Sequence, residues 1–256
     1  IYPDDISEHQ NKVELVNINS RELIELNLAG KKIKCVFKPF IGENNDVKEN
    51  DVKKNNGKIQ KFYPREVFAF ELSEYLGFDI VPPTIARDFD GKGKGALQLF
   101  IPTDQYLSEK KLEEKYPDIE EESWQKIIQT DDFAKMLAFD FIIANCDRNP
   151  GNYLVKILRE NNNVQSGISN NPREASLVAI DHGMCMDSSL YSNTIGEKDG
   201  PIKIVTDGNK KIKIPSNVLT LLSQGLEKRN DFNAEFIDEE ISKEEVEYMW
   251  MRIAAL

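Results

Sequence analysis

Two polar side chains that can act together on a reacting group lie in the segment FIIANCDRNPGNYLV, residues 141–155. The apolar runs FIIA and YLV flank a polar stretch that contains Asp147 and Asn152. A short loop between two buried elements can aim a carboxylate and an amide oxygen at one point. A carboxylate in such a loop can orient an acceptor hydroxyl, and an amide oxygen can bind a hard metal ion.

A second acid and a candidate cation extend this set. Asp181 follows the apolar run LVAI and stands two residues before a glycine, so we expect it at the end of a strand. Lys38 follows the apolar run IKCVF, and Glu66, Glu71 and Glu74 lie on the helix expected after it. The order along the chain is therefore strand Lys, helix Glu, Asp-x-x-x-x-Asn and Asp-x-Gly.

These residue types match the requirements of phosphoryl transfer from ATP. Magnesium or manganese needs oxygen ligands, for which Asn152 and Asp181 are the candidates. The phosphates need a cation held by an acid, here Lys38, and the acceptor needs a positioned carboxylate, here Asp147. Each match alone has an ordinary structural explanation, such as an acid in the loop after a helix. The collinear order of all of them favours a phosphotransferase.

The neighbours of these residues have simpler interpretations. Arg148 is interpreted as a scaffold ion-pair former, and His182 as a structural hydrogen-bonding residue. The glycine-rich turn GKGKG, residues 91–95, lacks the strand–loop–helix context of a phosphate loop, so we expect a hairpin tip there.

Composition limits the class of protein. The 256 residues suit one large domain or two small lobes around a cleft. A net charge of −11 argues against a nucleic-acid binder. No apolar run approaches the length of a membrane span. The three cysteines are too few for a disulfide framework or a zinc site, which favours a reducing compartment. We expect a cytoplasmic protein, or one delivered to a host cytosol if it is secreted.

The elements that must position these residues fall into two groups. Up to residue 101 we expect strands with one helix: a hairpin of residues 23–28 and 33–37, a helix between Pro64 and Gly77, and a second hairpin. The polar segments 42–57 and 161–173 are expected to be loops.

The remainder is expected to be largely helical. A helix begins at Asp131, strands follow at residues 153–158 and 177–180, and the chain ends in an amphipathic helix capped by Ser242 and Glu245. The predicted fold class is α+β, with a β-rich N-lobe at residues 1–101 and a helical C-lobe at residues 102–256 that together form one kinase domain.

Five segments resemble the phosphatidylinositol 3-/4-kinase-like superfamily. They are VFKP, FDIVPPT, LQLFI, NCDRNPGNYLV and VAIDHG, in collinear order between about residue 23 and residue 183. The type II phosphatidylinositol 4-kinases and related bacterial kinases, including the HipA-type protein kinases, look nearest. The resemblance implies a two-lobed, protein-kinase-like fold. It also implies that Asp147 is the catalytic acid and that Asn152 and Asp181 are metal ligands.

The resemblance assigns roles in the first hundred residues as well. Lys38 would bind the phosphates, and Glu66 would hold Lys38 in place. The segment NINSR, residues 17–21, stands where a glycine-rich loop would cover the phosphates, and Ser20 would touch them. The hinge that reads adenine through backbone groups would consist of Leu99, Phe100 and Ile101.

The acceptor is the least constrained part of the prediction. Asn149 stands where lipid 3-kinases carry a histidine, and no cysteine-rich palmitoylation segment is present. The negative charge disfavours an anionic membrane surface, so we expect a protein Ser or Thr as acceptor. The alternatives are a phosphatidylinositol kinase, a nucleotide-binding pseudokinase that acts as an interaction module, and an enzyme that transfers AMP instead of phosphate.

Overall fold

The computed structural model describes residues 14–18, 21–28, 30–39, 62–89, 91, 93–115, 127–160, 163–166, 177–186, 214–234, 237 and 240–256. Ser20 and the polar segment 42–57 lie outside the described residues. The chain forms two compact units. The smaller contains Ile1–Tyr63 and Pro83–Ile101, and the larger contains Pro64–Pro82 and Pro102–Leu256.

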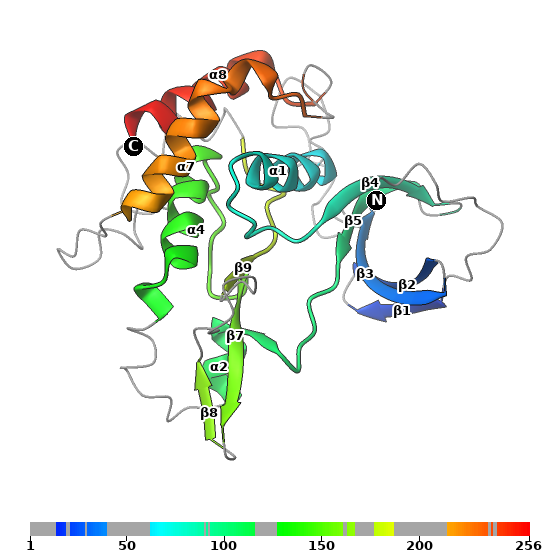
Figure 1. Ribbon diagram of the computed structural model, residues 1–256. Helices are drawn as coiled ribbons and strands as arrows, with labels where there is room; N and C mark the ends of the chain where they lie inside the picture. The colour runs from blue at the N-terminus through cyan, green and yellow to red at the C-terminus, as the bar shows by residue number, and fades with distance from the viewer. Residues whose placement is uncertain are drawn as a thin grey trace. The chain divides into compact units, whose positions relative to one another are not determined.

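The smaller unit is built on a five-stranded antiparallel sheet with the order β1-β2-β3-β5-β4. Its strands are β1 Glu14–Ile18, β2 Arg21–Leu28, β3 Lys31–Pro39, β4 Thr84–Phe89 and β5 Gly93–Leu99 (Figure 1). Both expected hairpins are confirmed, β2–β3 and β4–β5. Gly30 and Gly91 adopt φ 77°, a left-handed conformation that glycine tolerates in tight turns.

The core of this unit is small, and β3 supplies much of it. Ile24, Cys35, Phe37 and Leu97 are buried together, and the rings of Phe37 and Phe89 meet edge to face at 4.9 Å. Lys38 is also buried, with 3% of its surface exposed, and pairs with Ala96 on β5. The sheet therefore fixes the backbone of Lys38 between two neighbouring strands.

Gly95 allows β5 to approach β3 beside Lys38, and Gly95→Ala is expected to destabilise the smaller unit by about 1–3 kcal/mol. A Cβ at this position would lie 2.4 Å from the Lys38 carbonyl oxygen and 2.7 Å from the Phe37 ring. Because the nearer obstacle is backbone, the strands must separate to accept it. Urea unfolding followed by circular dichroism measures the change, with the exposed Lys94→Ala as control. Equal midpoints for the two variants would contradict the expected clash.

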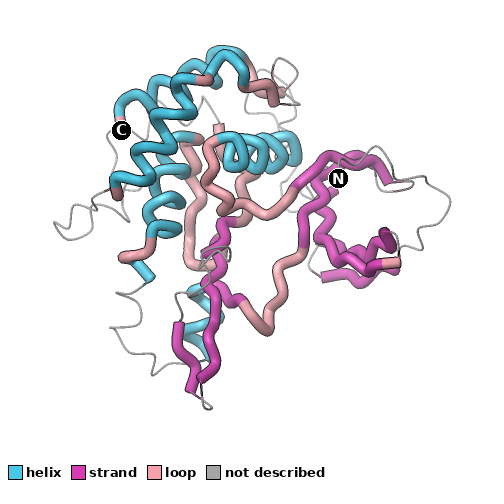
Figure 2. Tube along the Cα trace, viewed as in Figure 1, coloured by secondary structure: helices cyan, strands magenta, loops and turns pink. Residues whose placement is uncertain are grey.

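The larger unit combines helices with a second sheet (Figure 2). Its elements are α1 Tyr63–Tyr75, β6 Tyr106–Ser108, α2 Glu109–Lys115, α4 Asp131–Ile142, β7 Tyr153–Glu160, β8 Asn163–Ser166, β9 Leu177–Ala179, α7 Ser216–Glu227 and α8 Lys243–Ala255. Strand β7 is central and pairs antiparallel with β6, β8 and β9. None of the described helices combines the length and the apolarity that a bilayer crossing needs.

The strand β8 corrects one expectation from the sequence. Residues 161–173 were expected to be a loop, yet Asn163–Ser166 pairs antiparallel with the second half of β7. The polar composition of this segment gave no strand signal. A strand at this place needs only backbone hydrogen bonds to its neighbour, and those do not depend on apolar side chains.

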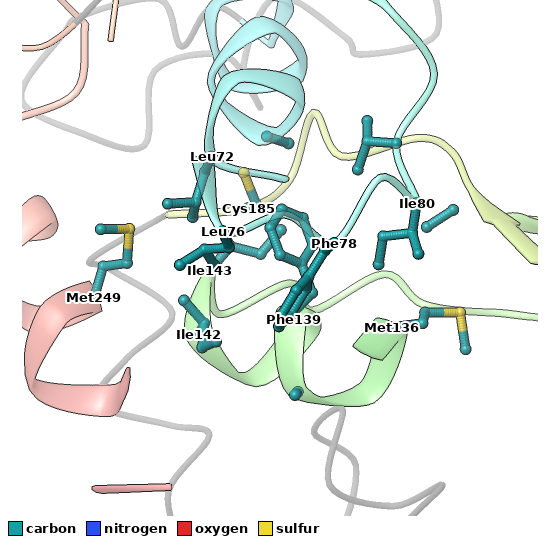
Figure 3. Packing of buried hydrophobic residues seen from close by; sticks show 14 of the residues in the cluster. Leu72, Leu76, Phe78, Ile80, Met136, Phe139, Ile142, Ile143, Cys185 and Met249 are labelled. Atoms are coloured by element: carbon teal, nitrogen blue, oxygen red, sulfur yellow. The ribbon is translucent and has the colours of Figure 1, made fainter. Parts of the chain in front are cut away.

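Helix α1 packs with the larger unit, although the sequence predicted it to belong to the lobe of residues 1–101. Leu72 of α1 and Leu76, in the turn directly after it, lie among residues of other helices, including Phe139 on α4 and Met249 on α8 (Figure 3). The physical reason is the size of the two cores. The broad apolar face of α1 is buried in the large cluster formed with α4 and α8, and burial of this area is the main favourable term.

Candidate active site

The loop that carries Asp147 begins where α4 ends in a tight left-handed cap. Ala144 adopts φ 47°, and the N–H of Asn145 donates to the carbonyl of Asp140 at 2.9 Å. This is the bond pattern of a Schellman motif, in which one left-handed residue reverses the chain after a helix. The chain therefore leaves the buried helix abruptly and enters the polar segment 145–152.

A buried ion pair holds this loop together. Arg148 donates to both carboxylate oxygens of Asp140, from Nε at 2.8 Å and from Nη2 at 2.9 Å, and both side chains are almost fully buried. Asn145 Nδ2 donates to the same carboxylate at 2.9 Å. Burial lowers the pKa of Arg148, but the charge and hydrogen bonds of Asp140, together with the charges of Asp181 and Glu66, outweigh it, so the net shift is upward. The interpretation of Arg148 as a scaffold residue is confirmed.

The remaining donors of Arg148 reach the second segment of the site. Its Nη1 donates to the carbonyls of Ile180, at 2.8 Å, and Asn152. Its Nη2 lies 2.9 Å from His182 Nε2, which must accept because a guanidinium only donates. His182 is therefore a structural partner of Arg148, as expected. One arginine thus joins α4, the loop and the residues around Asp181.

Asp147 and Asn152 lie together at the centre of the loop. Asn152 Nδ2 donates to the Asp147 carbonyl at 2.7 Å and to its Oδ2 at 3.1 Å. Asn149 Nδ2 lies 3.3 Å from Oδ1, and the N–H of Asp147 donates to Asn145 Oδ1 at 3.1 Å. The carboxylate is thus oriented by amides while staying only partly buried. Since the Nδ2 group of Asn152 faces Asp147, its Oδ1 is the atom suited to a cation.

Strand register places Asp181 beside Asn152. Tyr153 pairs with Ala179 across β7 and β9, and one step beyond, the N–H of Ile180 donates to the Asn152 carbonyl at 3.0 Å. Asp181 is the next residue and adopts φ 64°, the left-handed region in which Asp and Asn are enriched among non-glycine residues. The two predicted metal ligands are therefore brought to the same end of one strand pair.

The donor set suits magnesium bound together with phosphates. No group of three or more His, Cys, Asp or Glu side chains that could hold a metal occurs among the described residues. Asn152 and Asp181 offer an amide oxygen and a carboxylate, which are hard oxygen ligands. Magnesium in kinase sites is held by one or two such groups plus substrate phosphates and waters. The residues therefore fit an ion that arrives with a nucleotide.

The residues predicted to form the hinge use part of their hydrogen-bonding capacity within the smaller unit. The N–H of Leu99 donates to the Pro83 carbonyl at 2.8 Å, and the N–H of Phe100 donates to the Lys34 carbonyl at 2.9 Å. In the part of the chain that the structure describes, Ile101 is the hinge residue whose N–H is not committed in this way.

The sequence-predicted residues fall in both units. Asp147, Asn152 and Asp181 lie together in the larger unit, and Glu66 is buried in the first turn of α1 in the same unit. Lys38 belongs to the smaller unit. Because Lys38 and Glu66 belong to different units, their pairing stays a prediction.

Asp140 is not among the residues predicted from the sequence to be functional. Its signal was an acid within an otherwise apolar stretch of helix, LAFDFIIA, where a charge needs a buried partner. The spacing to Arg148 gave no further guidance, because the chain reverses between the two residues.

Comparison with known proteins identifies the class. The sequence model described as "Phosphatidylinositol 3- and 4-kinase" matches residues 52–221, more than half of the 256 residues. The chain belongs to this family, which confirms the resemblance and the α+β, two-lobed kinase-like fold class. The matched residues include Glu66, Asp147, Asn152 and Asp181, and they begin after Lys38.

The chain was also compared with solved structures and with curated proteins. Among solved structures, the proinflammatory kinase CtkA of Helicobacter pylori is similar, with 14% sequence identity and a TM-score of 0.49. That likeness covers 96% of this chain and 91% of the Helicobacter chain. No curated protein matches the sequence.

Proposed function

We propose that this chain is an ATP-dependent kinase that transfers the γ-phosphate to a hydroxyl of a protein Ser or Thr. The observation that supports it best is the hydrogen-bonded arrangement of Asp147, Asn152 and the Ile180–Asp181 segment at one end of β7 and β9. Family membership implies a kinase that uses ATP, typically with Mg²⁺. The range matched by the family model includes these three residues.

Each residue has a distinct role in the proposed reaction. Asp147 orients the acceptor hydroxyl and accepts its proton as the phosphoryl group is transferred. Asn152 and Asp181 would hold the metal through their amide and carboxylate oxygens, and the ion would supply positive charge to balance that of the phosphates. Arg148 keeps the loop and the Asp181 segment in register through the carbonyls of Asn152 and Ile180.

The family resemblance also suggests residues that would bind the nucleotide. Lys38 would contact the phosphates with Glu66 as its partner, and both are buried. The N–H of Ile101, together with hinge carbonyls, would read adenine. Ser20 would touch phosphate, although it lies outside the described residues.

The choice of acceptor rests on charge. A net charge of −11 disfavours approach to an anionic membrane surface, because each acidic residue near it is repelled. The second candidate is a phosphatidylinositol, which the description of the matched family favours directly. A pseudokinase is less well supported, because every polar residue expected at the site is present. We further propose a cytoplasmic location, in keeping with three free cysteines of which Cys35 and Cys185 are buried.

One assay with labelled ATP and Mg²⁺ separates these candidates. It has three arms: the protein alone, the protein with cell lysate, and the protein with phosphatidylinositol vesicles. Label in protein bands is the expected result, and label in lipid alone would establish the lipid kinase instead. Asp147→Ala run in parallel identifies label that comes from a contaminating kinase. Mg²⁺·ATP binding without label in any arm would support the pseudokinase, and release of pyrophosphate would reveal AMP transfer.

A further inference from the structure

The C-terminal helix α8 contacts the scaffold of the candidate site through a chain of buried polar groups. Glu245, in its first turn, has its carboxylate 3.4 Å from Nη2 of Arg65, and both side chains are about nine-tenths buried. Arg65 lies in the first turn of α1, directly before Glu66. The contact therefore joins residues that are 180 positions apart in the sequence.

Arg65 extends this contact to the segment that follows Asp181. Its Nη1 donates to the Cys185 carbonyl, and the Cys185 thiol lies 3.7 Å from the Arg65 carbonyl. The two residues are thus linked in both directions. Immediately after, the N–H of Met186 donates to the Ile143 carbonyl at 2.8 Å, next to the cap that ends α4. These bonds hold the C-terminal end of the segment from Asp181 to Met186, while the bonds of Ile180 with Asn152 and Arg148 hold the residue just before it.

A second arginine, Arg252 on α8, contacts the same region. Arg252 Nε donates to the Ile142 carbonyl at 2.6 Å, and its Nη2 lies 4.0 Å from the Met186 sulfur. Ile142 is the last residue of α4, and the loop with Asp147 begins just beyond it. Helix α8 therefore reaches both the start of the catalytic loop and the segment after Asp181.

We propose that α8 is a positioning element of the candidate site, which acts through Glu245 on Arg65 and through Arg65 on the segment that carries Asp181. The inference rests on the proposed function, because it assigns Asp181 a role in metal binding. Arg65 and Glu245 touch no reacting group. They fix the backbone that aims Asp181, and the same arginine fixes the helical turn that carries Glu66.

The chemistry of Glu245 offers a selective variant. One carboxylate oxygen, Oε2, accepts from the N–H and hydroxyl of Ser242 in a capping box, and the other faces Arg65. In Glu245→Gln the single amide oxygen can keep the capping box, since Gln also completes this motif. The amide NH₂ then faces the guanidinium, so a donor meets a donor. The helix cap survives while the link to Arg65 is lost.

Glu245→Gln is compared with two control variants. Glu247→Gln makes the same change at an exposed position of the same helix. Ser242→Ala removes the capping box but leaves a carboxylate for Arg65, so it reports the effect of a weakened helix alone. Arg65→Lys is the second test variant, because a lysine ammonium lacks the planar fork whose two Nη groups reach the Cys185 carbonyl and Glu245 separately.

The first readout needs neither metal nor nucleotide. Hydrogen–deuterium exchange of the peptide covering residues 181–186 is expected to be on the order of tenfold faster in Glu245→Gln and Arg65→Lys than in the wild type. The second readout is the Mg²⁺ concentration that gives half-maximal transfer, which is expected to rise about fivefold in the same variants, since coupled sites typically differ by 5–150-fold. Both controls should match the wild type in both readouts.

The outcomes separate this inference from the proposed function. Wild-type protein that neither binds Mg²⁺·ATP in calorimetry nor transfers phosphate would refute the proposed function. An active wild type with unchanged exchange and unchanged Mg²⁺ dependence in Glu245→Gln would refute the positioning role alone. A shift that Ser242→Ala reproduces, or the loss of cooperative melting in both test variants, would also refute it, because the contact would then serve folding only.

Discussion

Asp181→Ala is expected to abolish metal-dependent ATP turnover, with a loss on the order of a hundredfold or more. In the proposed function, this carboxylate is one of the two oxygen ligands of the metal. The other, the amide of Asn152, carries no charge to balance that of the ion. Asp147→Ala should lose transfer to a similar extent but keep much of the nucleotide affinity, since Asp147 addresses the acceptor and not the phosphates. Calorimetry with Mg²⁺·ATP and a radiolabelled transfer assay separate the two effects.

Comparing Mg²⁺·ATP binding and transfer in these two variants tests the roles proposed for Asp181 and Asp147. Loss of Mg²⁺·ATP binding only in Asp181→Ala, with loss of transfer in both, is the pattern that the proposed roles require. Full transfer activity in Asp147→Ala would show that Asp147 does not orient the acceptor hydroxyl. Asn149→Ala is a useful companion, because Asn149 contacts the same carboxylate from an exposed position.

Asp140→Ala is expected to destabilise the larger unit by about 3–5 kcal/mol, because it leaves the Arg148 guanidinium buried without its counter-charge. The ion pair is bidentate, with distances of 2.8 Å and 2.9 Å, and its side chains are 3% and 1% exposed. Chemical unfolding measures the loss. The salt bridge between Lys32 and Glu25, with Lys32 largely exposed, provides a control for which Glu25→Ala should cost less than about 1 kcal/mol.

A double replacement distinguishes stability from function at this pair. Asp140→Leu combined with Arg148→Met removes both charges, and such exchanges of a buried pair are often close to neutral for stability. We expect much of the lost stability to return while transfer activity stays low, because Arg148 also binds the carbonyls of Asn152 and Ile180. Activity equal to the wild type in this double variant would show that the pair does not organise the site.

The sequence predicted the parts of the site that depend on local spacing. Asp147 and Asn152 are five residues apart on one loop, so their contact followed from a short chain segment. Asp181 was placed by the apolar strand before it, and the register of β7 with β9 accounts for its position. Both inferences needed only the length of a loop and the end of a strand.

Contacts between segments far apart in the chain could not be predicted from the sequence. Arg65 and Glu245 are 180 residues apart, and no pattern along the chain indicates which buried arginine meets which acid. Arg148 was recognised as an ion-pair former, but its partner depended on the left-handed cap at Ala144. A non-glycine residue in that conformation is uncommon and has no clear sequence signal. The same limit applies to α1, whose helical periodicity showed that it buries a face but not against which core.

The left-handed backbone of Asp181 restricts what evolution can place at this position. With φ at 64°, Asp and Asn are favoured among side-chain-bearing residues, and β-branched residues are strongly penalised. Glutamate carries the same charge, but it is less favoured in this backbone conformation, and its longer side chain would place the carboxylate elsewhere. The accessible route away from activity is therefore a single step to Asn, which keeps the backbone and removes the charge. A homologue that has lost activity but kept the fold would be recognised by asparagine at the position of Asp181.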